Sequence, residues 1–152
     1  MSSFNSYLYA LGVTEQFLPD EYNLQNNQLT VPNTFVLSRT KNGETLSVYS
    51  DNVWDLSPYS PKCHCRLNFD SWLEDAREDD FLFCQIRAEM KKISFTLLYI
   101  KSGKSIIKSI EQRHTVLRQF AAIAYKNGCT LQQLFSDVAY MSKVNDAYVG
   151  VS

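Results

Sequence analysis

The chain of 152 residues is long enough for one domain with a sizeable core, and its 45% hydrophobic and 13% aromatic residues argue against wholesale disorder. The formal net charge is −1, yet residues 1–80 hold five Lys and Arg against twelve Asp and Glu, whereas residues 81–152 hold ten against four. Net charges of −7 and +6 predict either an anionic partner for the second half or docking of the two halves on each other.

The N-terminus, the hydropathy and the cysteines indicate in which compartment the protein is expected. The N-terminus MSSFNSYLYALG lacks a basic start and a long apolar run, and no stretch approaches the roughly 20 apolar residues that cross a bilayer. We therefore expect a cytoplasmic protein without a membrane partner. The triplet Cys63-His64-Cys65 offers three possible metal ligands, but no second ligand pair stands at zinc-site spacing. We expect reduced, structural cysteines, no metal and no cofactor.

The first regular element that the sequence predicts is a β-hairpin. Apolar and polar residues alternate in TFVLSRTKNGETLSVYS on both sides of Asn42-Gly43. Asn-Gly favours a tight turn in which both residues take positive φ. Strands are therefore predicted near 34–40 and 45–50.

The segment after the hairpin, residues 51–65, is predicted to be an irregular connector. Pro58 and Pro61 oppose regular structure there. Trp54 and Tyr59 are expected to hold the connector against the core, because packing is the commonest fate of such rings.

The next segments are predicted to be helical. A helix begins near residue 67, with Asn68 or Asp70 as its cap, and its acidic run EDAREDD is expected to be a solvated first turn. A longer helix follows and ends near Gly103. Apolar residues recur along it at steps of three and four: Phe83, Ile86, Met90, Ile93, Leu97 and Ile100.

A basic helix is predicted from Ser105 to Gly128. Its inward stripe is Ile106, Ile110, Leu117, Phe120, Ala121 and Ala124. The opposite side holds Lys104, Lys108, Glu111, Thr115, Arg118 and Gln119. At 3.6 residues per turn, His114 lies on the polar side of this helix and Arg113 on its apolar side. A third helix starts with a capping box, Thr130 and Gln133, and continues to about Met141.

These elements predict an α+β fold. A strand-containing N-terminal region, residues 1–66, precedes a small helical bundle, residues 67–152. The very short turns of the second region force neighbouring helices to pack side by side in antiparallel order.

Signals for catalysis are nearly absent. The chain has no Gly-rich phosphate loop and no H-E-x-x-H motif, and His64 and His114 are its only histidines. A small enzyme that uses His64 with Cys63 or Cys65 stays open as a minor alternative. We expect no catalytic residues.

Signals for binding are stronger. Eight cations between residues 87 and 118 face only Glu89 and Glu111, and Ser and Gln residues that can bond phosphate oxygens lie among them. An ordinary solvated helix face is the alternative interpretation. The predicted contacts with duplex DNA are Lys101, Lys104, Ser105, Lys108, Ser109, Gln112, Arg113 and Arg118. Gln112 and Arg113 are the candidates for reaching base edges, because both can make bidentate contacts.

The stretch ISFTLLYIKSGKSIIKSIEQRHTVLRQFAAIAYKNGCTLQQLF resembles the core-binding, SAM-like region of tyrosine recombinases, the phage-integrase family. The shared pattern is a helix, a short glycine turn at Gly103, a Ser-started helix, the packing pair Leu117 and Phe120, and a second glycine turn at Gly128. The family often has a small hydroxyl residue and an aromatic residue eight and four positions before that Leu. Ser109 matches this pattern and Arg113 departs from it.

The resemblance covers residues 79–141 and implies a domain that clamps one side of duplex DNA. In that family a separate C-terminal domain cuts the DNA, with a His-x-x-Arg motif among its catalytic residues. Here Leu67 and Leu117 stand at the Arg positions after His64 and His114. We therefore expect either the non-catalytic N-terminal part of a longer integrase-like protein, with other recombinase protomers or a catalytic domain as partners, or a stand-alone relative without strand-cutting activity. A protein–protein interaction module without nucleic-acid binding is the alternative.

Overall fold

The computed structural model describes residues 2–22, 29–75, 78–100 and 106–137, and every structural statement refers to these residues. A short helix over 131–137 follows the last of the other elements. Those elements, in chain order, are α1 (Ser3–Ala10), η1 (Glu15–Phe17), β1 (Val36–Arg39), β2 (Thr45–Val48), β3 (Val53–Asp55), η2 (Ser57–Tyr59), β4 (Arg66–Asn68), α2 (Phe81–Tyr99) and α3 (Ile106–Lys126).

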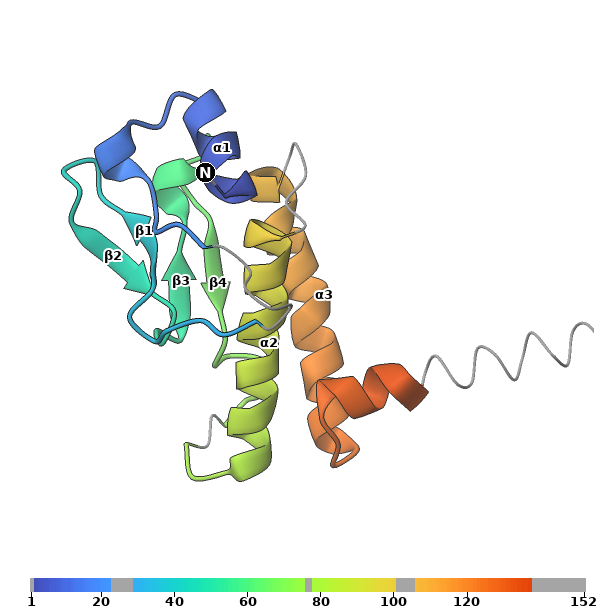
Figure 1. Cartoon of the computed structure of the whole chain (residues 1–152). Coiled ribbons are helices and arrows are strands. Elements are labelled where there is room, and N and C mark those ends of the chain that lie inside the picture. The colour runs from blue at the N-terminus through green and yellow to red at the C-terminus, as the bar shows by residue number, and fades with distance from the viewer. Residues whose placement is uncertain (1, 23–28, 76–77, 101–105, 138–152) are drawn as a thin grey trace, which may run out of the picture.

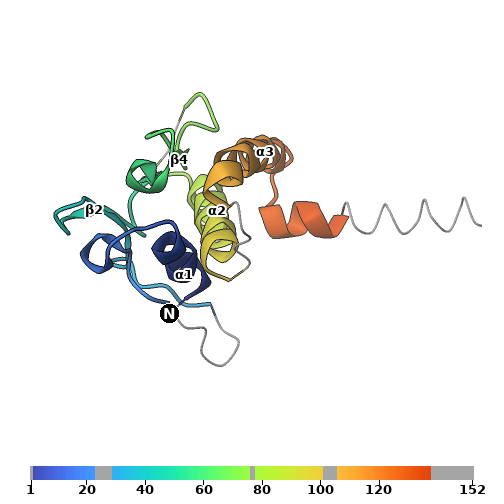
Figure 2. The same ribbon diagram turned by 90° about the horizontal axis from the view of Figure 1, so that it is seen from above.

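The predicted α+β class is confirmed. β1 pairs with β2 and β3 with β4, in two small antiparallel sheets, and three packed helices follow. α2 lies in the middle of the molecule, with the strands on one side and α3 on the other (Figure 1). Viewed from above, α1 packs beside the end of α2 (Figure 2). No helix of the described residues has the length and apolar character needed to cross a membrane.

The first hairpin lies where the sequence predicts it, but its turn differs. Gly43 has φ of +84°, whereas Asn42 is not in the positive-φ region. The amide of Gly43 donates to the carbonyl of Thr40, and the amide of Thr40 donates to the carbonyl of Glu44, both at 2.9 Å. A longer loop with a single left-handed residue therefore replaces the two-residue turn, and only the glycine position requires positive φ.

The prediction of an irregular connector over 51–65 is wrong. β3 forms inside it and pairs with β4, with Trp54 opposite Leu67. The two prolines lie outside the ladder, one in η2 and one in the loop beyond it, so they remove no strand hydrogen bond. Trp54 and Tyr59 are buried in the core, as expected.

The predicted start of the helical region is also wrong. Asn68 ends β4, and the helix α2 begins only at Phe81, after the acidic run. Asp80 caps α2 by accepting a hydrogen bond from the amide of Phe83 at 3.2 Å. Strand pairing with β3 overrides the capping potential of Asn68, whose side chain instead accepts from the amides of Asp70 and Ser71 in a turn.

An aromatic cluster joins α2 to the first hairpin. Phe95 is fully buried, and its ring lies 5.3 Å from Phe35 and 5.8 Å from Tyr49, centroid to centroid. It also stacks on Tyr99 at 4.4 Å and meets Tyr22 edge-on at 4.9 Å. The predicted stripe of α2 is thus confirmed at its first turns but rotates towards Phe95 and Leu98. Ile100, expected inside, is 38% exposed.

One hydrophobic core contains side chains from both predicted regions, including Trp54 of β3 and Ile86 of α2. The boundary between 66 and 67 falls within β4. The division into two regions stays a prediction.

Candidate nucleic-acid interface

The helix α3, which carries most of the predicted DNA contacts, packs against α2 through a continuous apolar stripe. Five of the six residues predicted for this stripe are buried: Ile106, Ile110, Leu117, Ala121 and Ala124. The sixth, Phe120, is 36% exposed and meets the ring of Phe135 edge-on at 5.5 Å. Gly128 ends the α3 region with φ of +67°, as its position after the helix predicts.

The prediction that His114 lies on the polar side of α3 and Arg113 on the apolar side is wrong, because the structure shows the reverse. His114 is only 5% exposed, whereas Arg113 faces solvent. The buried stripe runs Ile110, His114, Leu117, Ala121, at steps of four, three and four. This spacing was present in the sequence, but the polar character of histidine masked it.

His114 connects α3 to the second hairpin. Its Nε2 lies 2.7 Å from the carbonyl oxygen of Asn68, so Nε2 carries the proton and donates. Its Nδ1 is buried without a hydrogen-bond partner among the described residues, and its ring meets Phe69 edge-on at 5.1 Å. Burial lowers the pKa of His114, and the nearby Arg118 lowers it further, because both disfavour an imidazolium.

We expect acid to weaken this contact. Because the folded-state pKa of His114 lies below the unfolded value of about 6.5, its stabilising effect is complete above that value. It is lost as the pH falls from about 6.5 through the lowered pKa, with a limiting slope of about 1.4 kcal/mol per pH unit.

Urea unfolding at several pH values measures this effect. His114→Gln keeps a donor for Asn68 but cannot titrate, so its free energy of unfolding must fall less steeply in the same pH range. Equal slopes for the two proteins would contradict the assignment.

The outer face of α3 presents three of the predicted contact residues to solvent. Lys108, Gln112 and Arg113 are exposed and have no partner among the described residues. Ser109 lies between them, half-buried, with its hydroxyl donating to the carbonyl of Ile106 at 3.4 Å. These four residues lie within two turns of the helix, although Lys108 and Arg113, five residues apart, differ by about 140° around its axis. Three other predicted contacts, Lys101, Lys104 and Ser105, lie outside the described residues.

Arg118 lies apart from this group and is engaged within the fold. Its Nη2 donates to the carbonyl and to the hydroxyl of Ser71, both at 2.8 Å. It thereby fastens the segment after β4 to α3. A phosphate contact at Arg118 would have to share this guanidinium, and the assignment of Arg118 as a DNA contact stays a prediction.

Two other cations of the basic cluster are also used internally. Arg87 forms ion pairs with Asp70 at 2.8 Å and with Glu78 at 2.7 Å. Its hydrogen bond with Glu78 makes the largest contribution to raising the pKa of Arg87, and the bond with Asp70 raises it further. Lys91 is buried, donates to the carbonyl of Ser50 and to Asn52 Oδ1 at 3.1 Å each, and lies over the Phe69 ring. Burial lowers the pKa of Lys91, and repulsion from Arg87 adds to this. Part of the positive charge seen in the sequence therefore holds the two hairpins to α2.

The helix over 131–137 begins with the predicted capping box, which is confirmed. The amide of Gln133 donates to the Thr130 hydroxyl at 3.2 Å, and the amide of Thr130 donates to Gln133 Oε1 at 2.9 Å. Glu89 of α2 caps the same helix from outside, because its two carboxylate oxygens accept from the amides of Leu131 and Gln132 at 2.8 and 3.0 Å. The carboxylate of Glu89 therefore caps this helix and does not pair with the exposed cations among the described residues.

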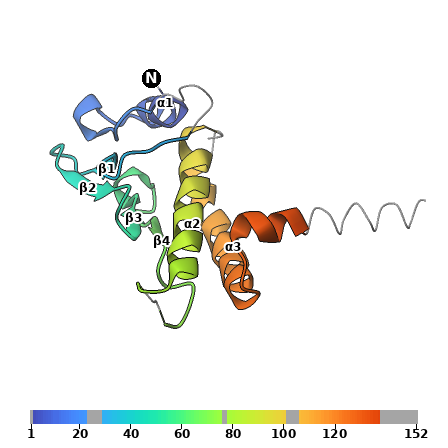
Figure 3. The ribbon, with the colours of Figure 1, turned by 60° about the horizontal axis from the view of Figure 1, so that its bottom comes forward.

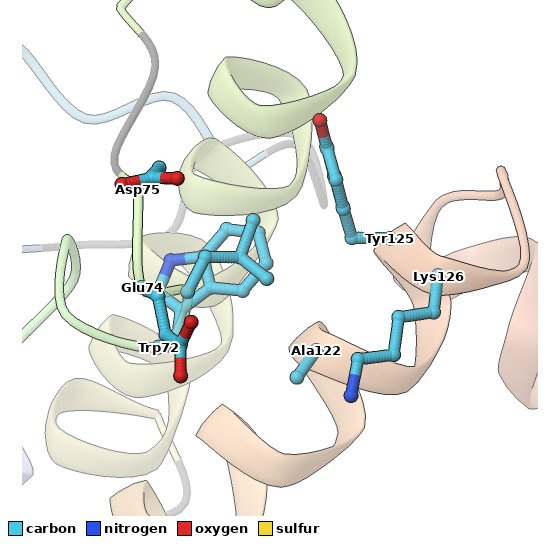
Figure 4. Close-up of a pocket in the computed structure, with 7 residues that line it drawn as sticks. Trp72, Glu74, Asp75, Ala122, Tyr125 and Lys126 are labelled. Carbon is cyan, nitrogen blue, oxygen red and sulfur yellow. The ribbon is translucent and has the colours of Figure 1, made fainter.

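A pocket of 420 Å³ lies between the segment after β4 and the end of α3. Trp72 lies on one side of it and Tyr125 on the other, and Glu74 and Lys126 project towards the opening from opposite sides (Figure 4). With Asp75 also in the lining, carboxylates outnumber cations there. This pocket is therefore poorly suited to a phosphate, in contrast to the outer face of α3.

Of the cysteine triplet, Cys65 is part of the core, whereas Cys63 is exposed. Cys65 is fully buried, and its burial, with a smaller contribution from Glu111, raises its pKa to about 12. A thiolate at Cys65 is thus strongly disfavoured at neutral pH. His64 Nε2 lies 3.8 Å from Glu111, on the surface. Among the described residues no three His, Cys, Asp or Glu side chains are grouped to hold a metal ion.

No family model, curated protein or solved structure matches this chain. The resemblance to the core-binding region of tyrosine recombinases therefore rests on the sequence pattern alone.

Proposed function

We propose that the chain binds duplex DNA through the outer face of α3, as a non-catalytic module of an integrase-like protein. One observation carries this proposal: Lys108, Gln112 and Arg113 are exposed within two turns of α3 without partners among the described residues, whereas Arg87 and Lys91 nearby are engaged in internal contacts. Cations left unpaired on a helix can neutralise phosphates and release counterions. An α-helix also fits the width of the major groove.

The roles within this face follow from side-chain chemistry. Lys108 and Ser109 would contact phosphate oxygens and fix the register of the helix on the duplex. Gln112 and Arg113 would reach base edges, where each can make paired hydrogen bonds. The family resemblance further implies that the chain clamps one side of the duplex and that a different domain cuts the strands.

A titration of a fluorescent random-sequence duplex, followed by anisotropy at two salt concentrations, tests the proposal. We expect saturable binding whose log affinity falls with log salt at a slope of about −0.9 for each phosphate neutralised. Polyglutamate of similar charge serves as the matched competitor and must displace the duplex poorly. Absence of binding at low salt would refute the proposal.

A specific observation favours protein binding as the second candidate. Val116, Phe120 and Ile123 lie on the exposed part of α3, with 46%, 36% and 45% of their surface accessible. Large apolar side chains gathered on one face are typical of a contact with another protein. Indifference to DNA in the titration would leave this interpretation of α3 as the better one.

A further inference from the structure

The outer face of α2 carries an unusually exposed ring. Phe81, the first residue of α2, is 81% exposed, which is the highest value among the large hydrophobic side chains described. Gln85, Ala88 and Lys92 are exposed on the same face, at steps of four, three and four residues from Phe81. At about 100° per residue, Phe81 and Lys92 differ by only about 20° around the helix. The ring and the lysine therefore point to one side of the molecule.

An apolar groove opens at the Lys92 end of this face. It has a volume of 550 Å³ and lies between α2 and the helix over 131–137, with Ile93, Leu131 and Phe135 as its apolar lining. A second hollow of 760 Å³ lies along the same helix and includes Gln85 in its lining. Figure 3 shows the 131–137 helix projecting from the body of the molecule beside α2 and α3. Phe135 remains 39% exposed, so no described side chain fills the groove.

The charges around the ring and around the groove are complementary. Glu89, at the groove, is committed to capping the 131–137 helix, so Lys92 is the rim charge that lacks a partner among the described residues. Asp79, two residues before Phe81, is exposed and also lacks a described partner. An acidic residue followed by an apolar ring is the chemistry that a lysine-rimmed apolar groove accepts.

We propose that the chain forms a two-fold dimer in which Phe81 of each copy enters this groove of the other copy, where Asp79 pairs with Lys92. Phe81 cannot reach the groove of its own molecule, because about 16 Å of rigid helix separates it from Lys92. Two α2 helices placed antiparallel bring both pairs together at once, since Phe81 and Lys92, at the rim of the groove, lie on one face. Ala88, near the middle, is small enough for the helices to approach closely.

The proposed dimer is a property additional to DNA binding and does not depend on it. The contact uses α2 and the 131–137 helix, whereas the proposed DNA contacts, Lys108, Ser109, Gln112 and Arg113, belong to α3. An isologous contact of this kind is closed, so the proposal predicts dimers and no larger assembly.

Sedimentation equilibrium over a range of protein concentrations, at low and high salt, tests the dimer. The wild type is expected to pass from monomer to dimer as its concentration rises, with a dissociation constant that increases with salt. Phe81→Ser should raise that constant at least about tenfold, because it removes the central apolar anchor. The matched control is Tyr9→Ser on α1, 60% exposed, which should leave the constant unchanged.

Charge exchange provides a second test that does not depend on the ring. Asp79→Lys and Lys92→Asp should each weaken the dimer, and the double variant should recover most of the wild-type affinity. A mixture of Phe81→Ser with Phe135→Ala should associate more tightly than either variant alone, since one ring and one groove remain intact. A monomeric wild type at every concentration, or no recovery in the double variant, would overturn the proposal.

Discussion

Replacing Phe95 by alanine is expected to lower the free energy of unfolding by about 3–5 kcal/mol. The side chain is fully buried at the centre of four other rings, contributed by the N-terminal segment, the first hairpin and α2 itself. Its removal forfeits the transfer free energy of the ring and leaves a cavity that rigid neighbouring rings cannot collapse into. Edge-to-face and stacked contacts add a further loss.

Chemical denaturation of dilute protein, followed by circular dichroism, measures this loss. The matched control is Phe81→Ala, the same substitution on the same helix at a site that is 81% exposed. It should change the free energy of unfolding by no more than about 0.5 kcal/mol. Similar losses for the two variants would mean that the ring cluster does not join α2 to the hairpin.

Reversing two charges on α3, with Lys108→Glu and Arg113→Glu together, is expected to lower DNA affinity roughly 100-fold at low salt. Lys108 is proposed to bond a phosphate and Arg113 a base edge, and each charged contact of this kind contributes about 1.5 kcal/mol, or close to tenfold in affinity. The slope of log affinity against log salt should also become shallower by about 1, because the phosphate contact of Lys108 is lost. Anisotropy titrations at several salt concentrations supply both quantities.

A variant with the same change in net charge separates a local contact from a general attraction. Lys41→Glu with Lys62→Glu alters two exposed lysines of the N-terminal half. This variant should weaken binding only slightly and leave the salt slope unchanged. Equal effects of the two double variants would show that DNA, if bound, is not held by the outer face of α3.

The sequence predicted best those features that depend on neighbours within four residues. The hairpin around Gly43, the capping box of Thr130 and Gln133, and the left-handed turn at Gly128 all occur where expected. Each arises from a local hydrogen bond or a local backbone requirement, so a short window of sequence contains the whole cause.

Features that depend on long-range pairing were predicted less well. The capping role fell to Asp80 rather than Asn68, because the pairing of β4 with β3 draws Asn68 into a strand. His114 proved to be buried because the carbonyl of Asn68, 46 residues earlier, accepts its ring N–H. Hydrophobic periodicity treats a histidine as polar, although its apolar ring packs well once one acceptor is supplied.

The division between structural and free cations illustrates the same limit at the candidate interface. The sequence alone determined that positive charge gathers between residues 87 and 118, on helices. Only the tertiary structure decided that Arg87 and Lys91 serve the fold while Lys108 and Arg113 face solvent. Helical periodicity sets the direction of a side chain, but the presence of a carboxylate or carbonyl at that place depends on how distant segments of the chain pack.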